Sequence, residues 1–294
     1  MIYDIAHHTT YKYDATVASA RCAMRLLPRG DRGQTVLSSK IELSPSAEFI
    51  NDRIDFHGNR VCEARILEPH TRLRIGLAAR VAVERPAPPA SALTPAWEIV
   101  RTAAHEANSL QASSPAHYIY ASRHAPLFDA ATAYARESFS PHRPILEGAI
   151  ELTKRIHADF AYDPDATHIA TPIVQAFDNR RGVCQDFAHI MIAALRGLGL
   201  AASYVSGYLR TYAAPGQARL EGADSTHAWV SVWCGPEFGF IDLDPTNAMA
   251  VGNDHIAIAI GRDYADVSPI DGVILGAGNQ DLDVSVDVKE AIVA

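Results

Sequence analysis

Hydrophobic and polar positions alternate with a period close to two along the first part of the chain. Residues 73–84 show this alternation, and a Gly-Asn turn signal at 58–59 separates two short β-prone runs, which is typical of a hairpin. Several strands at such short spacing predict an N-terminal β-sandwich-like domain over residues 1–85. Four prolines then fall within residues 86–95, where they remove backbone hydrogen-bond donors, so this segment is predicted to be a linker.

The period changes to that of a helix after the linker. Helices are predicted at 97–110, 130–138 and 144–159, followed by a short helix that has Thr171 as its N-cap, begins at Pro172 and ends near residue 177. The chain therefore combines a β-rich start with a part rich in helices.

A further helix is predicted to begin at Cys184. Apolar residues follow at helical spacing before a stop signal at Gly199, and they are Phe187, Ile190, Met191, Ala194, Leu195 and Leu198. Cys184 then lies in the first turn, where free N–H groups and the positive end of the helix dipole stabilise a thiolate and can hold a developing oxyanion. Gly182, which has no Cβ, would let a substrate backbone approach. The same segment is also compatible with a small buried cysteine that has no chemical role.

A histidine and an aspartate are brought together by a hairpin that is predicted farther along the chain. One strand begins at His227 and, after a turn, a second strand returns to Asp244. If Trp233 pairs with Phe240, Asp244 lies diagonal to His227 on the same face, within reach of its ring. Taken singly, His227 could be a strand-end histidine and Asp244 could start a turn. Together with a cysteine at a helix start, they predict a nucleophile, a base and a group that orients the base.

Composition and charge narrow the possible partners. The chain has 294 residues, of which 48% are hydrophobic, so it can bury a substantial core. Its formal net charge of -8 argues against nucleic acid or an anionic membrane surface as a partner. Neither a secretory signal nor a membrane-spanning stretch is found, and the few, scattered cysteines suit a reducing compartment, so a cytoplasmic protein is expected. No metal and no cofactor are expected. The cysteines are too sparse for a disulfide framework and lack metal-binding spacing; they are Cys22, Cys62, Cys184 and Cys234.

Three segments resemble the core motifs of bacterial transglutaminase-like proteins. They are Gly-Val-Cys-Gln-Asp-Phe-Ala (182–188), Ser-Thr-His-Ala-Trp-Val (225–230) and Asp-Leu-Asp-Pro-Thr-Asn (242–247), in the order found in that superfamily. Residues 1–85 and 255–269 also resemble the segments that flank this core in bacteria. The resemblance implies an α+β fold with a papain-like core at 96–294, which includes a C-terminal extension. In that core, a helix bearing the nucleophile packs on an antiparallel sheet bearing the base.

The resemblance also implies roles for individual residues. Cys184 would be the nucleophile, His227 the general base and acid, and Asp244 the group that orients His227. Tyr162 is the candidate side-chain donor to the oxyanion. The Gln-Cys-Trp form of animal transglutaminases is absent, since Gln185 follows the cysteine, and this favours hydrolysis over cross-linking.

The expected function is that of a cysteine peptidase or amidase, which cleaves an amide bond of a peptide or protein through a thioester. Trp229 shares the face of His227 and is a candidate for lining the substrate groove. The alternatives are acyl transfer from glutamine, a non-catalytic binding module, an interaction protein working through residues 1–84, and a zinc site of Cys184, His189 and His227. The sequence specifies neither the substrate, nor the acyl acceptor, nor the oligomeric state.

Overall fold

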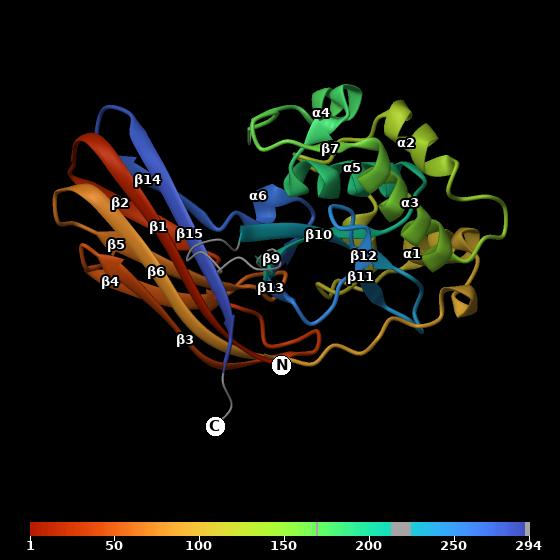
Figure 1. Ribbon diagram of the computed structural model, residues 1–294, viewed down its shortest axis with the longest axis horizontal. Coiled ribbons are helices and arrows are strands. Elements are labelled where there is room, and N and C mark those ends of the chain that lie inside the picture. The colour runs from red at the N-terminus through yellow and green to blue at the C-terminus, as the bar shows by residue number, and fades with distance from the viewer. Residues whose placement is uncertain (169, 213–224, 292–294) are drawn as a thin grey trace.

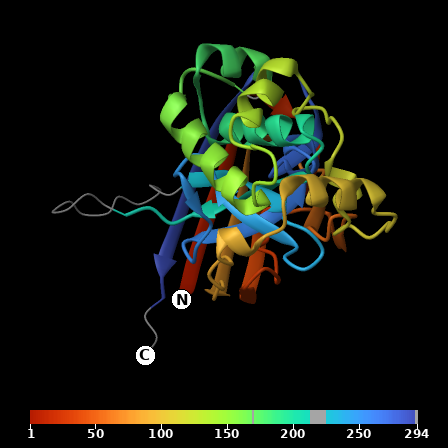
Figure 2. The same cartoon turned by 90° about the vertical axis from the view of Figure 1, so that its right-hand side faces the viewer.

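Two layers of β-strands lie beside a helix-covered sheet in the protein (Figure 1). Residues 1–168, 170–212 and 225–291 are described by this computed structural model. The helices gather at the end away from the two layers, and Figure 2 shows them in front of the strands when the molecule is viewed from that end. The α+β class and the β-rich N-terminal region are confirmed.

The layers are two four-stranded antiparallel sheets. One has the order β15-β1-β6-β3, with β1 (Ile2–Val17), β3 (Gln34–Ser44), β6 (His70–Val83) and β15 (Gln280–Glu290). The other has the order β14-β2-β5-β4, with β2 (Ser19–Met24), β4 (Phe49–Ile54), β5 (Arg60–Ile66) and β14 (Ile270–Leu275). Buried and less buried positions alternate from Ile2 to Thr9 in β1, so its side chains point to the core with the period of a strand.

The last two strands of the chain belong to these N-terminal sheets. β14 pairs with β2, and β15 pairs with β1 from Tyr3–Glu290 to Tyr13–Gln280. In Figure 1 the blue C-terminal strands accordingly lie among the red and orange ones. The C-terminal extension that was expected to continue the core at 96–294 therefore completes the N-terminal layers instead. This correction concerns a long-range pairing, which no local pattern of residues announces.

The second part of the chain surrounds a five-stranded antiparallel sheet of order β12-β11-β10-β9-β13. Its strands are β9 (Ala202–Leu209), β10 (Ser225–Trp233), β11 (Phe240–Asp244), β12 (Met249–Ala250) and β13 (His255–Gly261). The helices are α1 (Trp97–Glu106), α2 (Asp129–Arg136), α3 (Ile145–Asp159), α4 (Ile173–Asn179), α5 (Cys184–Gly197) and α6 (Tyr264–Val267). Two short strands, β7 (Ala161–Tyr162) and β8 (Arg181–Gly182), pair in parallel beside α5.

α5 is the central helix of this part. It packs against β9, β10 and α2, and every residue from Asp186 to Arg196 is buried, as expected of a helix enclosed by protein. The predicted start at Cys184 is confirmed, and Gly199 turns the chain with a φ of +80° that favours glycine. None of the helices in the described ranges is both long and apolar enough to cross a bilayer.

Candidate active site

Cys184 is the first residue of α5, and its neighbours hold the start of this helix in place. The Asp186 carboxylate turns back and accepts hydrogen bonds from the Val183 N–H (2.9 Å) and the Thr167 hydroxyl (2.6 Å). Gly182 is needed for this turn, since a Cβ there would lie 2.6 Å from Asp186 Oδ2. Gly182 therefore makes room for the cap of the helix, whereas the sequence suggested room for a substrate backbone.

The pairing of β10 with β11, with Trp233 opposite Phe240 as predicted, brings His227 and Asp244 into contact. His227 Nε2 lies 2.8 Å from Asp244 Oδ2. The Cys184 side chain also acts on this imidazole and helps to raise its pKa, and the ring nitrogen left for it is Nδ1. Thiol, imidazole and carboxylate thus form a continuous row.

The imidazole of His227 is buried between a thiol and a carboxylate. Burial alone would lower its pKa, but the hydrogen bonds to Asp244 and Cys184 outweigh this effect and raise the pKa of His227 to about 10. Burial would likewise raise the pKa of Asp244, yet hydrogen bonds, first of all from His227, hold that pKa well below its usual range. The ring is consequently charged at neutral pH, and an imidazolium beside a sulfur stabilises the thiolate.

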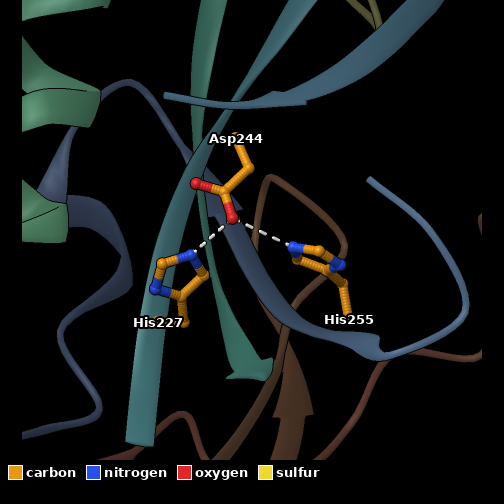
Figure 3. A group of neighbouring side chains, drawn as sticks. All are labelled: His227, Asp244 and His255. Atoms are coloured by element: carbon orange, nitrogen blue, oxygen red, sulfur yellow. Dashed lines mark hydrogen bonds and ion pairs between the residues drawn. The ribbon is translucent and has the colours of Figure 1, made fainter. Parts of the chain in front are cut away.

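Asp244 is fully buried, and both of its carboxylate oxygens accept several hydrogen bonds. Oδ1 accepts from the backbone N–H groups of Thr246 (2.9 Å) and Asn247 (3.2 Å). In addition to His227, Oδ2 accepts from the Asn247 amide at 2.7 Å and lies 3.1 Å from His255 Nε2 (Figure 3). Sequence reasoning assigned no role to Asn247 or His255. Asn247 closes the third motif, which was a signal, whereas nothing in the pattern around His255 distinguishes it.

Cys184 differs from the other cysteines in its exposure. It is half-buried, whereas the other three free thiols, Cys22, Cys62 and Cys234, are buried. Burial raises the pKa of all three, to about 12 for Cys62 and Cys234. These three thiols are therefore poor nucleophiles at neutral pH.

Tyr162 lies beside the candidate nucleophile. It pairs with Gly182, two residues before Cys184, and its ring meets that of Phe187 edge-on with 6.4 Å between the centroids. Burial and the nearby Cys184 both raise the pKa of the Tyr162 phenol, which is therefore neutral and able to donate a hydrogen bond. Its role as an oxyanion donor stays a prediction.

Trp229 does not line a groove. Its side chain is fully buried, and its Nε1–H donates to Asp242 Oδ2 at 3.3 Å. The ring belongs to a small hydrophobic cluster with Val205, Val251, Ala257 and Ile260. The alternation along β10 identified the face that Trp229 shares with His227, but it did not show that protein covers this face beyond His227.

The structure does not bring together the zinc site that was considered with His189. The ring of His189 is buried, its Nε2 accepts from the Tyr264 N–H at 3.2 Å, and burial lowers its pKa to about 3. Within the described parts of the chain, one group of side chains offers three metal-binding atoms close together, namely His227, Asp244 and His255. Hydrogen bonds among these side chains already use the atoms concerned, so we assign no metal to them.

Comparisons with known proteins show the family of the chain. Residues 3–82 match the bacterial transglutaminase-like N-terminal region, and residues 132–245 match the transglutaminase-like superfamily. An uncharacterized protein of Mycobacterium tuberculosis is 38% identical over 97% of this chain and 92% of its own length. An uncharacterized protein of Mycobacterium leprae is 30% identical over 97% of each chain.

A solved structure shares the fold. It is described as a candidate cysteine protease from Cytophaga hutchinsonii, and it matches with a TM-score of 0.74 and 19% identity over 100% of this chain and 92% of that one. At such an identity the likeness concerns the fold alone. The sequence matches and the fold agree, and the chain belongs to the transglutaminase-like superfamily, with the bacterial transglutaminase-like N-terminal region ahead of its core.

Proposed function

We propose that the protein is a cysteine-dependent amide hydrolase, a peptidase or amidase, that works through a thioester on Cys184. The observation that carries this proposal is the row of side chains in which the Cys184 thiol acts on the His227 imidazole, and His227 Nε2 lies 2.8 Å from Asp244 Oδ2. The fold shared with a candidate cysteine protease is consistent with this chemistry. So is the exposure of Cys184, which exceeds that of the other thiols.

The proposed reaction has two halves. The Cys184 sulfur bonds to the amide carbonyl carbon, whose oxygen takes up the electron pair and is stabilised by N–H groups at the start of α5. The C–N bond then breaks as the His227 imidazolium gives its proton to the departing amine, and a thioester remains. Water attacks the thioester while His227 takes a proton from it. The C–S bond breaks, which releases a carboxylic acid and restores the thiolate and the imidazolium.

Water is the proposed acceptor because the Gln-Cys-Trp form of cross-linking enzymes is absent around Cys184. The same thioester would give acyl transfer if an amine reached it before water. The proposed substrate is a peptide or protein amide in the cytoplasm, since few, scattered cysteines suit a reducing compartment and all four are free thiols. No cofactor enters this proposal.

A peptide library in ¹⁸O-labelled water tests the proposal and separates the two acceptors. The wild-type protein should cleave amides and place ¹⁸O in the new carboxyl groups, while Cys184→Ala should not. Cys22→Ala, which removes a buried thiol of β2, is the matched control and should behave as wild type. Products carrying an added primary amine in place of ¹⁸O would show transfer. Equal cleavage by Cys184→Ala, or none by wild type, would contradict the proposal.

A further inference from the structure

His255 places a second imidazole on the carboxylate that holds His227 (Figure 3). Its Nε2 lies 3.1 Å from Asp244 Oδ2, the oxygen that His227 Nε2 meets at 2.8 Å. The ring of His255 is 1% exposed, so no solvent competes for either nitrogen. The three side chains come from three strands, β10, β11 and β13, and they meet although β9 separates β10 from β13 in the sheet.

The hydrogen bonds of His255 determine which of its nitrogens carries the proton. The backbone N–H of Gly252 donates to His255 Nδ1 at 3.4 Å, so Nδ1 offers a lone pair. The proton of the neutral ring then sits on Nε2, from which it is donated to Asp244 Oδ2. Both nitrogens are thereby engaged, and the ring is held in one tautomer and one orientation.

Donors on one carboxylate oxygen compete with one another. Each hydrogen bond to Oδ2 withdraws part of the negative charge that would otherwise act on His227. If Asp244 acted on His227 alone, it would raise the proton affinity of the imidazole further, and the proton on Nδ1 would then be released less readily to the departing amine. The charged and titratable groups that meet this network come from several elements. They are Cys184 on α5, His227 on β10, Asp242 and Asp244 on β11, His157 on α3 through the Thr246 carbonyl, and Arg85 through the His255 carbonyl.

We propose that His255 is a positioning residue, which fixes the Asp244 carboxylate and limits how far this carboxylate raises the proton affinity of the His227 ring. This inference deepens the proposed function and rests on it. His255 touches neither the sulfur nor a substrate in this account. It acts through Asp244, much as the outer partners of a metal-bound histidine act through their hydrogen bonds.

A His255→Phe variant tests this role, because phenylalanine keeps a ring of similar shape and removes the donor. We expect the pH midpoint of the His227 imidazolium, followed by NMR of the histidine rings, to rise by about half a pH unit or more, the size expected for one lost hydrogen bond. An unchanged or lowered midpoint would overturn the proposal. His7→Phe is the matched control, since His7 is equally buried and hydrogen-bonds with Tyr208 (2.9 Å) and Thr9 (2.8 Å), not with Asp244. It should lower stability and leave the midpoint in place.

Two further measurements keep the outcomes distinct. If His255→Phe does not fold, the wild-type spectrum decides: the proton of the neutral His255 ring should sit on Nε2, and a neutral ring with its proton on Nδ1 would overturn the proposal. Alkylation of wild-type Cys184 by iodoacetamide at pH 6.5 tests the proposed function separately. A wild-type Cys184 as inert as the buried thiols would sink that function. A reactive Cys184 with an unmoved midpoint would reject the role of His255 alone.

Discussion

The buried carboxylate of Asp244 is the residue on which the site depends most. An isolated carboxylate in such a place costs several kcal/mol, which only complete hydrogen bonding can offset. Asp244 meets this condition, since Thr246 and Asn247 satisfy one oxygen while Asn247, His227 and His255 satisfy the other. The same bonds orient His227 toward Cys184.

Replacing Asp244 by asparagine should disable this orientation with little change in shape. The new amide presents at most one acceptor where Oδ2 now meets three side-chain donors, and it cannot stabilise an imidazolium. We expect the amide-cleavage rate to fall roughly 10³-fold or more, as for other catalytic rows that lose this charge. Cleavage of a peptide substrate and alkylation of Cys184 at pH 6 would both report the loss. Asp178→Asn, at an exposed position of α4, should leave both rates intact, and an active Asp244→Asn would contradict the assignment.

The raised pKa of His227 has a consequence for stability. A group whose pKa increases on folding, here to about 10, binds its proton more tightly in the folded state. Its contribution is complete below the ordinary value near pH 6.5 and is lost as the pH rises through about 10. Urea denaturation of wild type should therefore show a free energy of unfolding that falls between pH 7 and 10 more steeply than in His227→Gln. Parallel curves for the two proteins would contradict this.

At the scale of elements, the sequence predicted those features that depend on residues close together along the chain. The start of α5, its glycine stop and the β10–β11 register follow from local spacing, and they bring Cys184, His227 and Asp244 together. The alternation along β10 also predicted which residues share a face. Whether protein or solvent covers that face depends on the rest of the fold, so the prediction that Trp229 lines a groove was wrong. The pairing of β14 and β15 with the first strands and the meeting of His255 with Asp244 join segments that are distant along the chain or the sheet, which local patterns do not encode.

The start of α5 is expected to depend on Asp186. Its carboxylate satisfies the Val183 N–H and the Thr167 hydroxyl, and without it both donors and the positive helix end lose a partner. Asp186→Ala should lower the free energy of unfolding by about 1–2 kcal/mol and slow the alkylation of Cys184. Chemical denaturation and intact-mass kinetics measure the two effects.

Glu147 offers a control for Asp186. It lies in the first turn of α3 and reaches only a 4.0 Å ion pair with Arg143. Glu147→Ala should therefore change stability by less than about 0.5 kcal/mol. Equal effects of the two alanines would mean that the cap is unimportant.

At the scale of the whole molecule, the N-terminal layers and the core meet at Asp242. Arg32, between β2 and β3, reaches Asp242 Oδ1 at 2.5 Å and Ser231 Oγ at 2.9 Å. Arg85, which follows β6, approaches the other carboxylate oxygen at 3.7 Å. Burial opposes the charge on Asp242, but the arginines prevail, so its pKa lies below the usual range. Asp242 lies two residues before Asp244 on the same strand. The ion pairs of Asp242 with Arg32 and Arg85 therefore tie β11, which carries Asp244, to the N-terminal part of the chain.

Removing Arg32 should weaken the whole fold. Asp242 would stay buried with a single, more distant cation, and broken buried pairs are strongly destabilising. We expect Arg32→Ala to lower the free energy of unfolding by about 2–4 kcal/mol in urea titrations. Arg53→Ala, which breaks the more exposed pair of Arg53 with Glu63 (2.9 Å), should lower it by less than about 1 kcal/mol. Similar losses in both variants would show that Arg32 does not tie the two parts together.

The most direct test of the account is to trap the acyl-enzyme. The protein would be mixed with a peptide library, quenched in acid and analysed by intact-mass and peptide mass spectrometry. We expect an added acyl mass on Cys184, labile to hydroxylamine and absent in Cys184→Ala. Amide cleavage with no adduct on this thiol, or an adduct that persists when Cys184 is replaced, would contradict the central claim.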